Sequence, residues 1–295
     1  MSDYGGFQVK VTNSSKMMYP RDGITKGDMV SYYSMISSVM LPHVRDRPVS
    51  MLRYPNGIDG ESFFQKQVPD HFPEWFATVK VRKKGGQVIH AMVQKEADLA
   101  YLANYACITP HVWLSRAGSL ERPDRLTLDM DPFDDDFITV KDAALAAASE
   151  LRPLGLKPFV MTTGSRGLHV TVPLDRTAPF GEALSLAKEV ADRMVEGDDR
   201  FTTERSKADR NGRLLVDVFR NAYGQTAVPP YALRARDGAP VATPLHWEEL
   251  EDPGLTSRRF NMRTVFERLR ARGDPWSEIE RHASSIKDAA DRMRK

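Results

Sequence analysis

Asp129 and Asp131 are the residues of this sequence whose spacing most clearly suggests chemistry. They stand two residues apart in the segment Leu128-Asp129-Met130-Asp131-Pro132, at the end of an apolar run that is typical of a strand. In an extended chain such residues point to the same face, with α-carbons roughly 6.5 Å apart. Both carboxylates can therefore reach cations held between them, and oxygen ligands of this kind suit Mg²⁺ or Mn²⁺.

Asp217 is a third candidate ligand because it stands alone within the apolar run 214–219. An unpaired buried carboxylate is strongly destabilising, so Asp217 needs a cation as a partner. Arg213 or Arg220 could supply it, which is the simplest structural explanation. The alternative is a metal site, since three converging carboxylates with two divalent ions would clamp the attacking and leaving oxygens of a phosphoryl transfer.

A glycine-flanked turn, Thr163-Gly164-Ser165-Arg166-Gly167-Leu168-His169, lies between these carboxylates in the chain. Glycines let backbone N–H groups approach an anion, and Ser165, Arg166 and His169 offer donors suited to a triphosphate. The segment lacks the Lys-Ser/Thr ending of a P-loop, which argues against an ATPase of that class. An ordinary hairpin turn is the alternative for the segment taken alone.

Charge is distributed unevenly, although the net charge of the 295 residues is only +2. Residues 200–240 hold eight Arg or Lys against four Asp or Glu, whereas residues 121–136 are acidic. This separation suits anions on one side and metal cations on the other. Lys207, Arg213, Arg234 and Arg236 could neutralise phosphates, and a solvated basic face is the alternative for any one of them.

Hydrophobic periodicity predicts the elements that must position these residues. Strands are expected at 125–128, 158–161, 168–174 and 214–219, with helices at 141–151 and 181–196. The order strand, helix, strand, strand, helix, strand is the split β-α-β, ferredoxin-like pattern. We therefore expect an α+β fold in which the first and last strands of this unit carry Asp129 and Asp217.

The flanking segments have weaker patterns. A strand is expected at 8–12, and Thr25 is a candidate cap for a helix that runs through Asp28 to about Met40. Helical segments are expected at 248–250, 263–271 and 275–292. The predicted organisation is a single two-lobed domain at 1–295, with an N-terminal lobe at 1–120, a catalytic core at 121–240 and a helical C-terminal segment at 241–295.

Cysteine usage and hydropathy indicate the compartment. Cys107 is the single cysteine, so no internal disulfide or multi-cysteine zinc site can form, which favours a reducing environment. No run of 18 apolar residues occurs, and the N-terminus lacks the features of a secretory signal. The sequence predicts a cytoplasmic protein with no membrane partner.

These motifs together resemble the archaeo-eukaryotic primase superfamily, and within it the polymerase domain of the bacterial end-joining DNA ligase D. The resemblance spans essentially the whole chain. It is carried by the segments 53–57, 63–66, 129–132, 164–169, 216–218 and 230–234, which read RYPNG, FFQK, DMDP, GSRGLH, VDV and PYALR. It implies the primase catalytic core, with an RRM-like β-α-β-β-α-β unit carrying the metal carboxylates and flanking helices.

The resemblance implies roles for individual residues. The two divalent ions, Mn²⁺ or Mg²⁺, would be held by Asp129, Asp131 and Asp217. The incoming nucleotide would be contacted by His111 near its sugar and by Ser165, Arg166, Gly167, His169, Lys207 and Arg234. A DNA 5′-phosphate across a gap or break would be bound by Asn13, Lys16 and Lys26. The template strand would be contacted by Arg53, Phe63 and Phe64, the two rings stacking on bases.

The activity implied is that of a template-dependent nucleotidyltransferase in DNA repair. It would add nucleotides, preferring ribonucleotides, to 3′ ends at gaps and double-strand breaks in non-homologous end joining. Its partners would be DNA with a 5′-phosphorylated gap or break, NTP or dNTP, a Ku-like end-binding protein and a separate DNA ligase. Alternatives are a primase that starts chains de novo, a non-catalytic DNA-end-bridging protein and a metal-dependent phosphatase.

The departures from the family pattern are few. Met130 stands where the family usually has Leu, and Arg166 where it often has Lys. The Lys-x-Asp-Gly nucleophile motif of a DNA ligase is missing from the sequence. The Met1 start favours a stand-alone polymerase over an excised domain.

Overall fold

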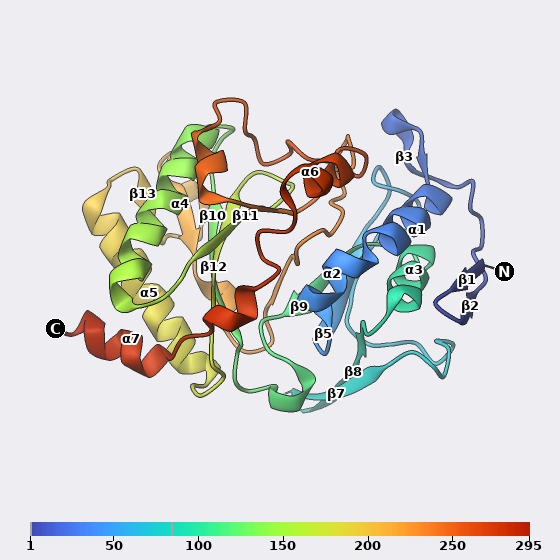
Figure 1. Cartoon of the computed structure of the whole chain (residues 1–295), viewed down its shortest axis with the longest axis horizontal. Helices are drawn as coiled ribbons and strands as arrows, with labels where there is room; N and C mark the ends of the chain where they lie inside the picture. Colours follow the sequence, from blue (N-terminus) through green and yellow to red (C-terminus); the bar gives the residue numbers. More distant parts are fainter. Residues whose placement is uncertain (1, 84) are drawn as a thin grey trace. The chain divides into compact units, whose positions relative to one another are not determined.

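The computed structural model describes residues 2–83 and 85–295, which form two compact units (Figure 1). The N-terminal unit comprises residues 1–118, 226–242 and 260–271, and the central unit comprises residues 119–225, 243–259 and 272–295. The chain after residue 225 thus alternates between the two units, whereas the sequence suggested consecutive segments divided at 120 and 240.

A six-stranded sheet forms the middle of the central unit. Its strands, in spatial order, are β13 (Phe201–Thr202), β14 (Leu214–Asp217), β10 (Arg125–Asp131), β12 (Leu168–Pro173), β11 (Phe159–Thr162) and β16 (Thr243–Leu245). Neighbouring strands are antiparallel except β13 and β14, which are parallel. The succession of strands and helices predicted for 125–219 is confirmed, and β13 and β16 extend the sheet at its two edges.

Two helices, α4 (Phe137–Leu151) and α5 (Phe180–Gly197), lie side by side over this sheet (Figure 1). Their apolar faces are rich in alanine, and they pack against β10, whose alternate residues Leu126, Leu128 and Met130 are fully buried. Successive side chains of a strand point to opposite faces. Asp129 and Asp131 therefore project from the face of the sheet that α4 and α5 do not cover.

Asp136 shows why the acidic run after β10 is not all available for metal chemistry. Its carboxylate accepts a hydrogen bond from the Ile138 backbone N–H at 2.9 Å and caps the first turn of α4. The side-chain hydrogen bond from Thr139 lowers the pKa of Asp136, so the capping carboxylate stays ionised. This acid therefore fixes the start of α4, directly after the strand that carries Asp129.

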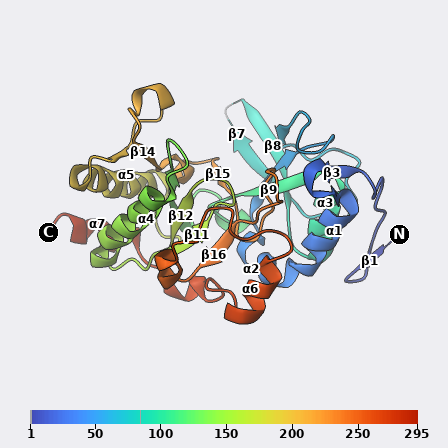
Figure 2. The same cartoon turned by 90° about the horizontal axis from the view of Figure 1, so that it is seen from above.

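The N-terminal unit is built around a second sheet. Its strands, in spatial order, are β15 (Thr226–Ala227), β9 (Cys107–Trp113), β5 (Pro48–Arg53), β8 (Gly86–Met92) and β7 (Thr78–Lys83), and β6 (Phe63–Gln65) also pairs with β5. The helices of this unit are α1 (Lys26–Met35), α2 (Ser37–Val44), α3 (Glu96–Asn104) and α6 (Val265–Arg272). Figure 2 shows α1 and α3 beside each other, and these two helices make extensive contact.

Thr25 caps α1 as the sequence predicted. The Asp28 backbone N–H donates to the Thr25 hydroxyl at 3.2 Å, and the Thr25 backbone N–H donates to the Asp28 carboxylate at 2.8 Å, which is a capping box. The helix ends at Met35, earlier than the predicted Met40, and α2 follows after Ile36. The chain before it forms two short hairpins, β1 (Ser2–Tyr4) with β2 (Phe7–Val9), and β3 (Met17–Tyr19) with β4 (Ile24–Thr25).

The helix predicted at 275–292 is wrong in its middle. The chain forms a 3₁₀ turn at Ile279–His282 and then α7 (Ile286–Met293). Between them, the Ser284 backbone N–H donates to the Pro173 carbonyl at 3.1 Å, at the end of β12. This bond to the sheet competes with continued helix, so tertiary contact overrides the helical periodicity.

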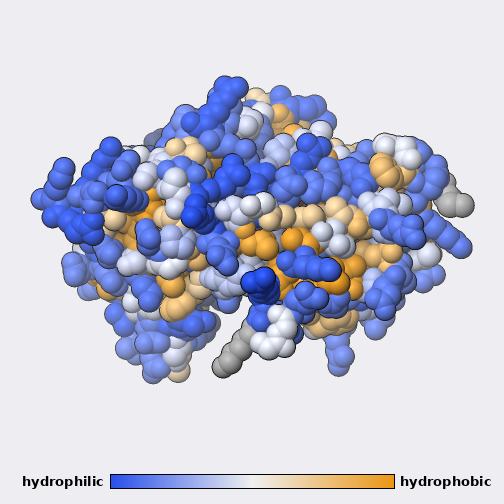
Figure 3. Space-filling view, turned by 90° about the horizontal axis from the view of Figure 1, so that it is seen from below, coloured by the Kyte–Doolittle hydropathy of each residue, from blue (hydrophilic) through white to orange (hydrophobic). Residues whose placement is uncertain are grey.

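One face of the protein is mostly hydrophilic (Figure 3), as expected for a sequence without a long apolar run. Hydrophilic residues cover most of the face shown in Figure 3, and hydrophobic residues lie in smaller patches among them. Across residues 2–83 and 85–295, no helix combines the length and apolar character needed to cross a membrane.

Candidate active site

Asp129 lies between two partner strands at the middle of the central sheet. It is directly opposite Asp217 on β14 and directly opposite His169 on β12. Directly paired residues on neighbouring strands project from the same face. The strand pairing therefore brings together Asp129, Asp217 and His169, three residues that the sequence had selected from separate segments.

Positive groups surround the buried carboxylate of Asp129. The Arg220 Nε and Nη2 atoms both donate to Asp129 Oδ2 at 3.2 Å, and His169 Nε2 lies 3.5 Å from Asp129 Oδ1. Burial alone would raise the pKa of Asp129, but His169 and Arg220 hold it well below its usual value. Burial would lower the pKa of Arg220, yet Asp129 and Asp217 raise it. Asp129 is therefore an ionised carboxylate in this site.

Asp131 is held by two arginines. Arg166 Nη2 lies 3.1 Å from Asp131 Oδ1, and Arg210 Nη1 lies 3.1 Å from Asp131 Oδ2. Arg210 is buried and also donates to the backbone carbonyls of Glu204 and Arg205. Sequence reasoning did not select Arg210, because its only signal was membership of the basic stretch 200–240.

Asp217 ends β14 and has weaker partners. Its Oδ1 atom accepts a hydrogen bond from the Phe219 backbone N–H at 2.8 Å, and its Oδ2 atom lies 3.8 Å from Arg220 Nε. The cation that the sequence required for this carboxylate is therefore Arg220, which Asp217 shares with Asp129.

Among the residues that the structure describes, no group of three or more His, Cys, Asp or Glu side chains is placed to hold a metal ion. The three carboxylates are instead directed at arginines. Their chemistry nevertheless fits a hard divalent cation, because all three supply oxygen donors and Asp129 and Asp217 are register partners. The metal role of the three aspartates stays a prediction.

The turn at 163–167 is closely packed next to these carboxylates. The Thr163 hydroxyl accepts hydrogen bonds from the backbone N–H groups of Ser165 at 3.3 Å and Gly167 at 3.2 Å. A Cβ atom on Gly167 would lie only 1.9 Å from the Met130 carbonyl oxygen, between Asp129 and Asp131. Glycine is therefore required for the turn to lie against β10, and in this position Arg166 reaches Asp131.

Arg258 and Lys207 also belong to the central unit. Arg258, which sequence reasoning missed, donates from Nε to the Ser165 carbonyl at 2.8 Å. Lys207 is exposed, and its Nζ atom lies 4.9 Å from the centre of the Phe133 ring. The structure thus keeps Lys207 in the central unit without placing it on any of the three carboxylates.

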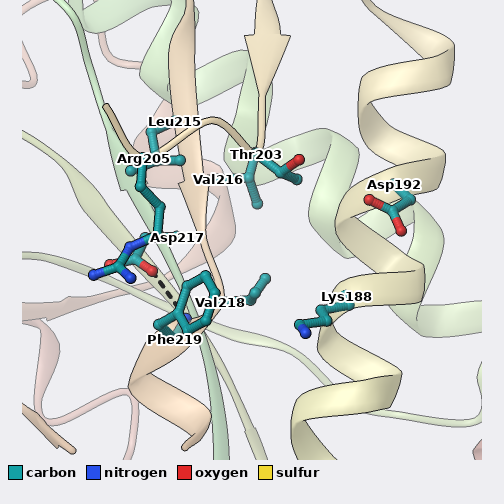
Figure 4. Close-up of a pocket in the computed structure, with 9 residues that line it drawn as sticks. All are labelled: Lys188, Asp192, Thr203, Arg205, Leu215, Val216, Asp217, Val218 and Phe219. Carbon is teal, nitrogen blue, oxygen red and sulfur yellow. Dashed lines mark hydrogen bonds between the residues drawn. The ribbon is translucent and has the colours of Figure 1, made fainter. Parts of the chain in front are cut away.

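A pocket of about 180 Å³ opens beside Asp217, between α5 and the outer edge of β14 (Figure 4). Its lining comes from α5, the segment after β13, and β14 with the residues that follow it: Lys188, Asp192, Thr203, Arg205, Leu215, Val216, Asp217, Val218 and Phe219. The pocket therefore combines two basic side chains and an aromatic ring with one of the predicted catalytic carboxylates.

The residues predicted to bind a 5′-phosphate meet in the N-terminal unit. The Lys16 backbone N–H donates to the Asn13 carbonyl at 3.0 Å, and the Lys26 backbone N–H donates to the Lys16 carbonyl at 2.8 Å. The Lys26 side chain is buried and donates to the Thr12 hydroxyl at 3.1 Å. Burial, and then the charge of Lys16, lowers the pKa of Lys26. Two lysines whose backbones are joined at the start of α1, and whose charges interact, are suited to an anion.

The residues predicted to contact the template also lie together. Phe63 and Phe64 are large exposed rings on β6, 46% and 56% exposed. The guanidinium carbon of Arg53 lies 5.3 Å from the centre of the Phe63 ring and 3.6 Å from that of Tyr105. The Phe64 ring packs edge-on against His111 with centroids 5.2 Å apart. Phe63 therefore pairs with Arg53, and Phe64 with His111, and the alternation along β6 directs the two rings to opposite faces of the strand.

Arg234 belongs to the N-terminal unit as well. Its backbone N–H donates to the Pro240 carbonyl at 2.8 Å, and its carbonyl accepts from the buried Tyr19 hydroxyl at 3.0 Å. The predicted nucleotide contacts are therefore divided, with Ser165, Arg166, Gly167, His169 and Lys207 in the central unit and His111 and Arg234 in the N-terminal unit.

Residues 25–276 match the family described as LigD, primase-polymerase domain. The chain belongs to this family. Members of the LigD primase-polymerase family are nucleotidyltransferases of the end-joining repair polymerase type, so the family resemblance stated from the motifs is confirmed.

Curated relatives and a solved structure support the assignment. The multifunctional non-homologous end joining DNA repair protein LigD of Mycobacterium tuberculosis is 33% identical over 286 residues, and the bifunctional LigD of Bacillus subtilis is 29% identical over 278. These matches cover 94% and 93% of this chain but only 37% and 44% of the relatives, so the chain spans less than half of their length. The polymerase domain of M. tuberculosis ligase D in complex with DNA superposes with a TM-score of 0.87 at 33% identity, covering 94% of this chain and 99% of that one.

Proposed function

We propose that this LigD-type polymerase domain is a template-dependent nucleotidyltransferase that extends 3′ ends at gaps and double-strand breaks during non-homologous end joining. The observation that carries the proposal is the register of the central sheet, which pairs Asp129 directly with Asp217 and places Asp131 two residues further along the same strand. Carboxylates in this arrangement are suited to phosphoryl transfer with two divalent ions.

Asp129, Asp131 and Asp217 are the residues that would hold two Mg²⁺ or Mn²⁺ ions. Such ions, when bound, lower the pKa of the attacking 3′-hydroxyl and neutralise charge on the phosphates. The chain itself supplies the rest of the charge stabilisation. Arg166 and Arg220, which face the carboxylates in this structure, would turn to the triphosphate once cations occupy the aspartates. Arg210 is buried and would stay bonded to the Glu204 and Arg205 carbonyls.

The turn at 163–169 would hold the triphosphate. Its Ser165 hydroxyl, Arg166 guanidinium and His169 imidazole are donors, and the close packing of Gly167 on β10 keeps them beside the acids. In this proposal Lys207 and Arg234 also contact the nucleotide. His111 senses the 2′-hydroxyl and favours ribonucleotides.

DNA would be bound through the N-terminal unit. The Lys16 and Lys26 pair would take the 5′-phosphate on the far side of a gap, and the exposed rings of Phe63 and Phe64 would stack on template bases. The DNA in the M. tuberculosis complex supports such contacts by similarity. A Ku-like end-binding protein and a separate ligase would act with this domain in the cytoplasm. The two units would form a single polymerase domain, in which the RRM-like part carries the carboxylates.

The deciding experiment is primer extension on gapped duplex DNA, with and without a 5′-phosphate across the gap. Mn²⁺ or Mg²⁺ and ribo- or deoxyribonucleotides are supplied in turn, and His111→Ala is run beside the wild-type protein. We expect templated addition that the 5′-phosphate stimulates, with a ribonucleotide preference that His111→Ala weakens. Synthesis without any primer would support a de novo primase, and tight binding of DNA ends with no incorporation under either metal would support an end-bridging protein.

A further inference from the structure

Lys188 and Arg205 flank the ring of Phe219 in the pocket beside Asp217 (Figure 4). The Lys188 Nζ atom lies 5.7 Å from the ring centre, and the Arg205 guanidinium carbon lies 4.4 Å from it. Both residues are exposed, and within the described chain neither has an ion-pair partner. Two cations held over one aromatic ring are suited to a phosphate and its adjoining sugar or base.

The position of this pocket follows from the strand order. β13 pairs only with Leu214 and Leu215, so in the sheet as described the outer edge of β14 has no strand neighbour at Val216 and Asp217. The space left there is lined by Thr203 and by α5. The turn at 163–169 leads into β12, which lies on the other side of β10. In the strand order, the pocket beside β14 and the turn that leads into β12 therefore lie on opposite sides of β10.

The role inferred for this pocket rests on the proposed function, which is phosphoryl transfer to a 3′ end. The attacking and leaving oxygens lie roughly in line on opposite sides of the phosphorus. With the triphosphate held at the turn, the attacking 3′ end approaches Asp129 and Asp217 from the β14 side. We propose that Lys188, Arg205 and Phe219 bind the sugar–phosphate backbone of the strand that is extended, close to its 3′ end.

The negative charge of Asp192 predicts an effect on DNA binding opposite to that of Lys188 and Arg205. It lies on the α5 wall of the pocket, one turn beyond Lys188, and repels a phosphodiester placed there. Removing this charge with Asp192→Asn therefore tightens the binding of a primed template, whereas removing either basic charge weakens it.

The test measures equilibrium binding of a fluorescent primed template by the full chain, together with the KM for the incoming nucleotide. The double variant Lys188→Gln with Arg205→Gln raises the Kd about tenfold. The decline of log K with log salt becomes shallower, by about one unit of slope for each phosphate that the variant no longer neutralises. The KM for the nucleotide stays unchanged. Lys287→Gln is a control for the loss of one exposed lysine, because Lys287 lies on α7, shortly after Ser284, which pairs with Leu174 at the opposite end of β12 from His169.

A second measurement locates the binding site on the strand. Primers carrying neutral methylphosphonate linkages near the 3′ end bind the wild-type protein more weakly than normal primers, whereas the double variant binds both equally, because the two changes remove one interaction. An unchanged Kd for the double variant overturns the proposal, as does a raised KM with unchanged primer binding, which would assign the pocket to the triphosphate. These binding results are independent of activity, so they are distinguishable from failure of the proposed function, in which the wild-type protein extends no primer.

Discussion

Asp129 and Asp217 are direct cross-strand partners, and one side chain, Arg220, serves both of them. Arg220 makes two hydrogen bonds to Asp129 at 3.2 Å and lies 3.8 Å from Asp217. Two carboxylates on adjacent strands repel each other unless a cation lies near them. The arrangement therefore requires positive charge, which Arg220 supplies in this structure and which divalent ions would supply during catalysis.

Removing Arg220 should make the stability of the protein depend on metal. With Arg220→Gln, the buried Asp129 loses charge-assisted hydrogen bonds, and we expect the free energy of unfolding to fall by about 1–3 kcal/mol in EDTA. Added Mn²⁺ should recover most of this loss, because the cation replaces the missing charge. Urea denaturation with and without Mn²⁺ measures the effect, and Arg236→Gln, at an exposed arginine, is the control. An equal loss in both conditions would contradict a metal site at these carboxylates.

Asp217→Asn should abolish extension while leaving DNA binding intact. The substitution keeps the size of the side chain but removes the charge opposite Asp129, so we expect the extension rate to fall by about 10²-fold or more. The Kd for gapped DNA should stay within twofold of the wild-type value. Asp135→Asn removes an exposed carboxylate from the acidic stretch after β10 and should extend normally. Normal extension by Asp217→Asn would show that the metal assignment is wrong.

Gly167 should tolerate no side chain. An alanine Cβ would lie 1.9 Å from the Met130 carbonyl oxygen, so Gly167→Ala must push the turn away from β10. We expect a loss of about 1–3 kcal/mol in the free energy of unfolding and a raised KM for the nucleotide. In contrast, Gly181→Ala in α5 meets open space and should be neutral or stabilising. Denaturation and steady-state kinetics on both variants provide the comparison.

Much of the central unit could be predicted from sequence because its signals are local. The apolar alternation of the strands, the helical spacing of 181–196 and the isolated Asp217 fixed the order of elements and the face that carries the acids. The sequence did not predict the register of β10 with β14, and the structure shows that this register pairs Asp129 directly with Asp217. Their role as metal ligands stays a prediction.

The remaining features depend on contacts that no local pattern encodes. Arg210 reaches Asp131 from 79 residues away, and nothing distinguishes it in sequence from the other arginines of 200–240. The break in the predicted C-terminal helix arises because the Ser284 backbone N–H pairs with the end of β12. Both are tertiary effects, in which a distant partner decides the role of a residue whose own propensity is neutral.

Phe64 should contribute to template affinity and little to folding. Its ring is 56% exposed, and base stacking on such a ring is worth about 1–3 kcal/mol per base. Phe64→Ala should therefore weaken binding of a templating overhang by that amount, with the melting temperature nearly unchanged. Ile138→Ala, at an exposed residue of α4, is the control for loss of exposed apolar surface. Equal binding of blunt and overhanging DNA by the wild-type protein would argue against a template platform.

As pH rises, the preference for a 5′-phosphate should begin to weaken at a lower pH than it would if Lys26 had the pKa of an ordinary lysine. Burial and the charge of Lys16 lower the pKa of Lys26 below its usual 10.5. The charged form of Lys26 is present below this depressed pKa and is lost as pH rises through it, so the attraction for phosphate declines in the same window. The measurement is the ratio of Kd values for gapped DNA with a 5′-hydroxyl and a 5′-phosphate, followed from neutral to alkaline pH. Lys26→Arg keeps its charge over this range and should flatten the decline, whereas Lys16→Ala with Lys26→Ala should remove the preference at every pH. A preference that is constant with pH in the wild-type protein would place the phosphate elsewhere.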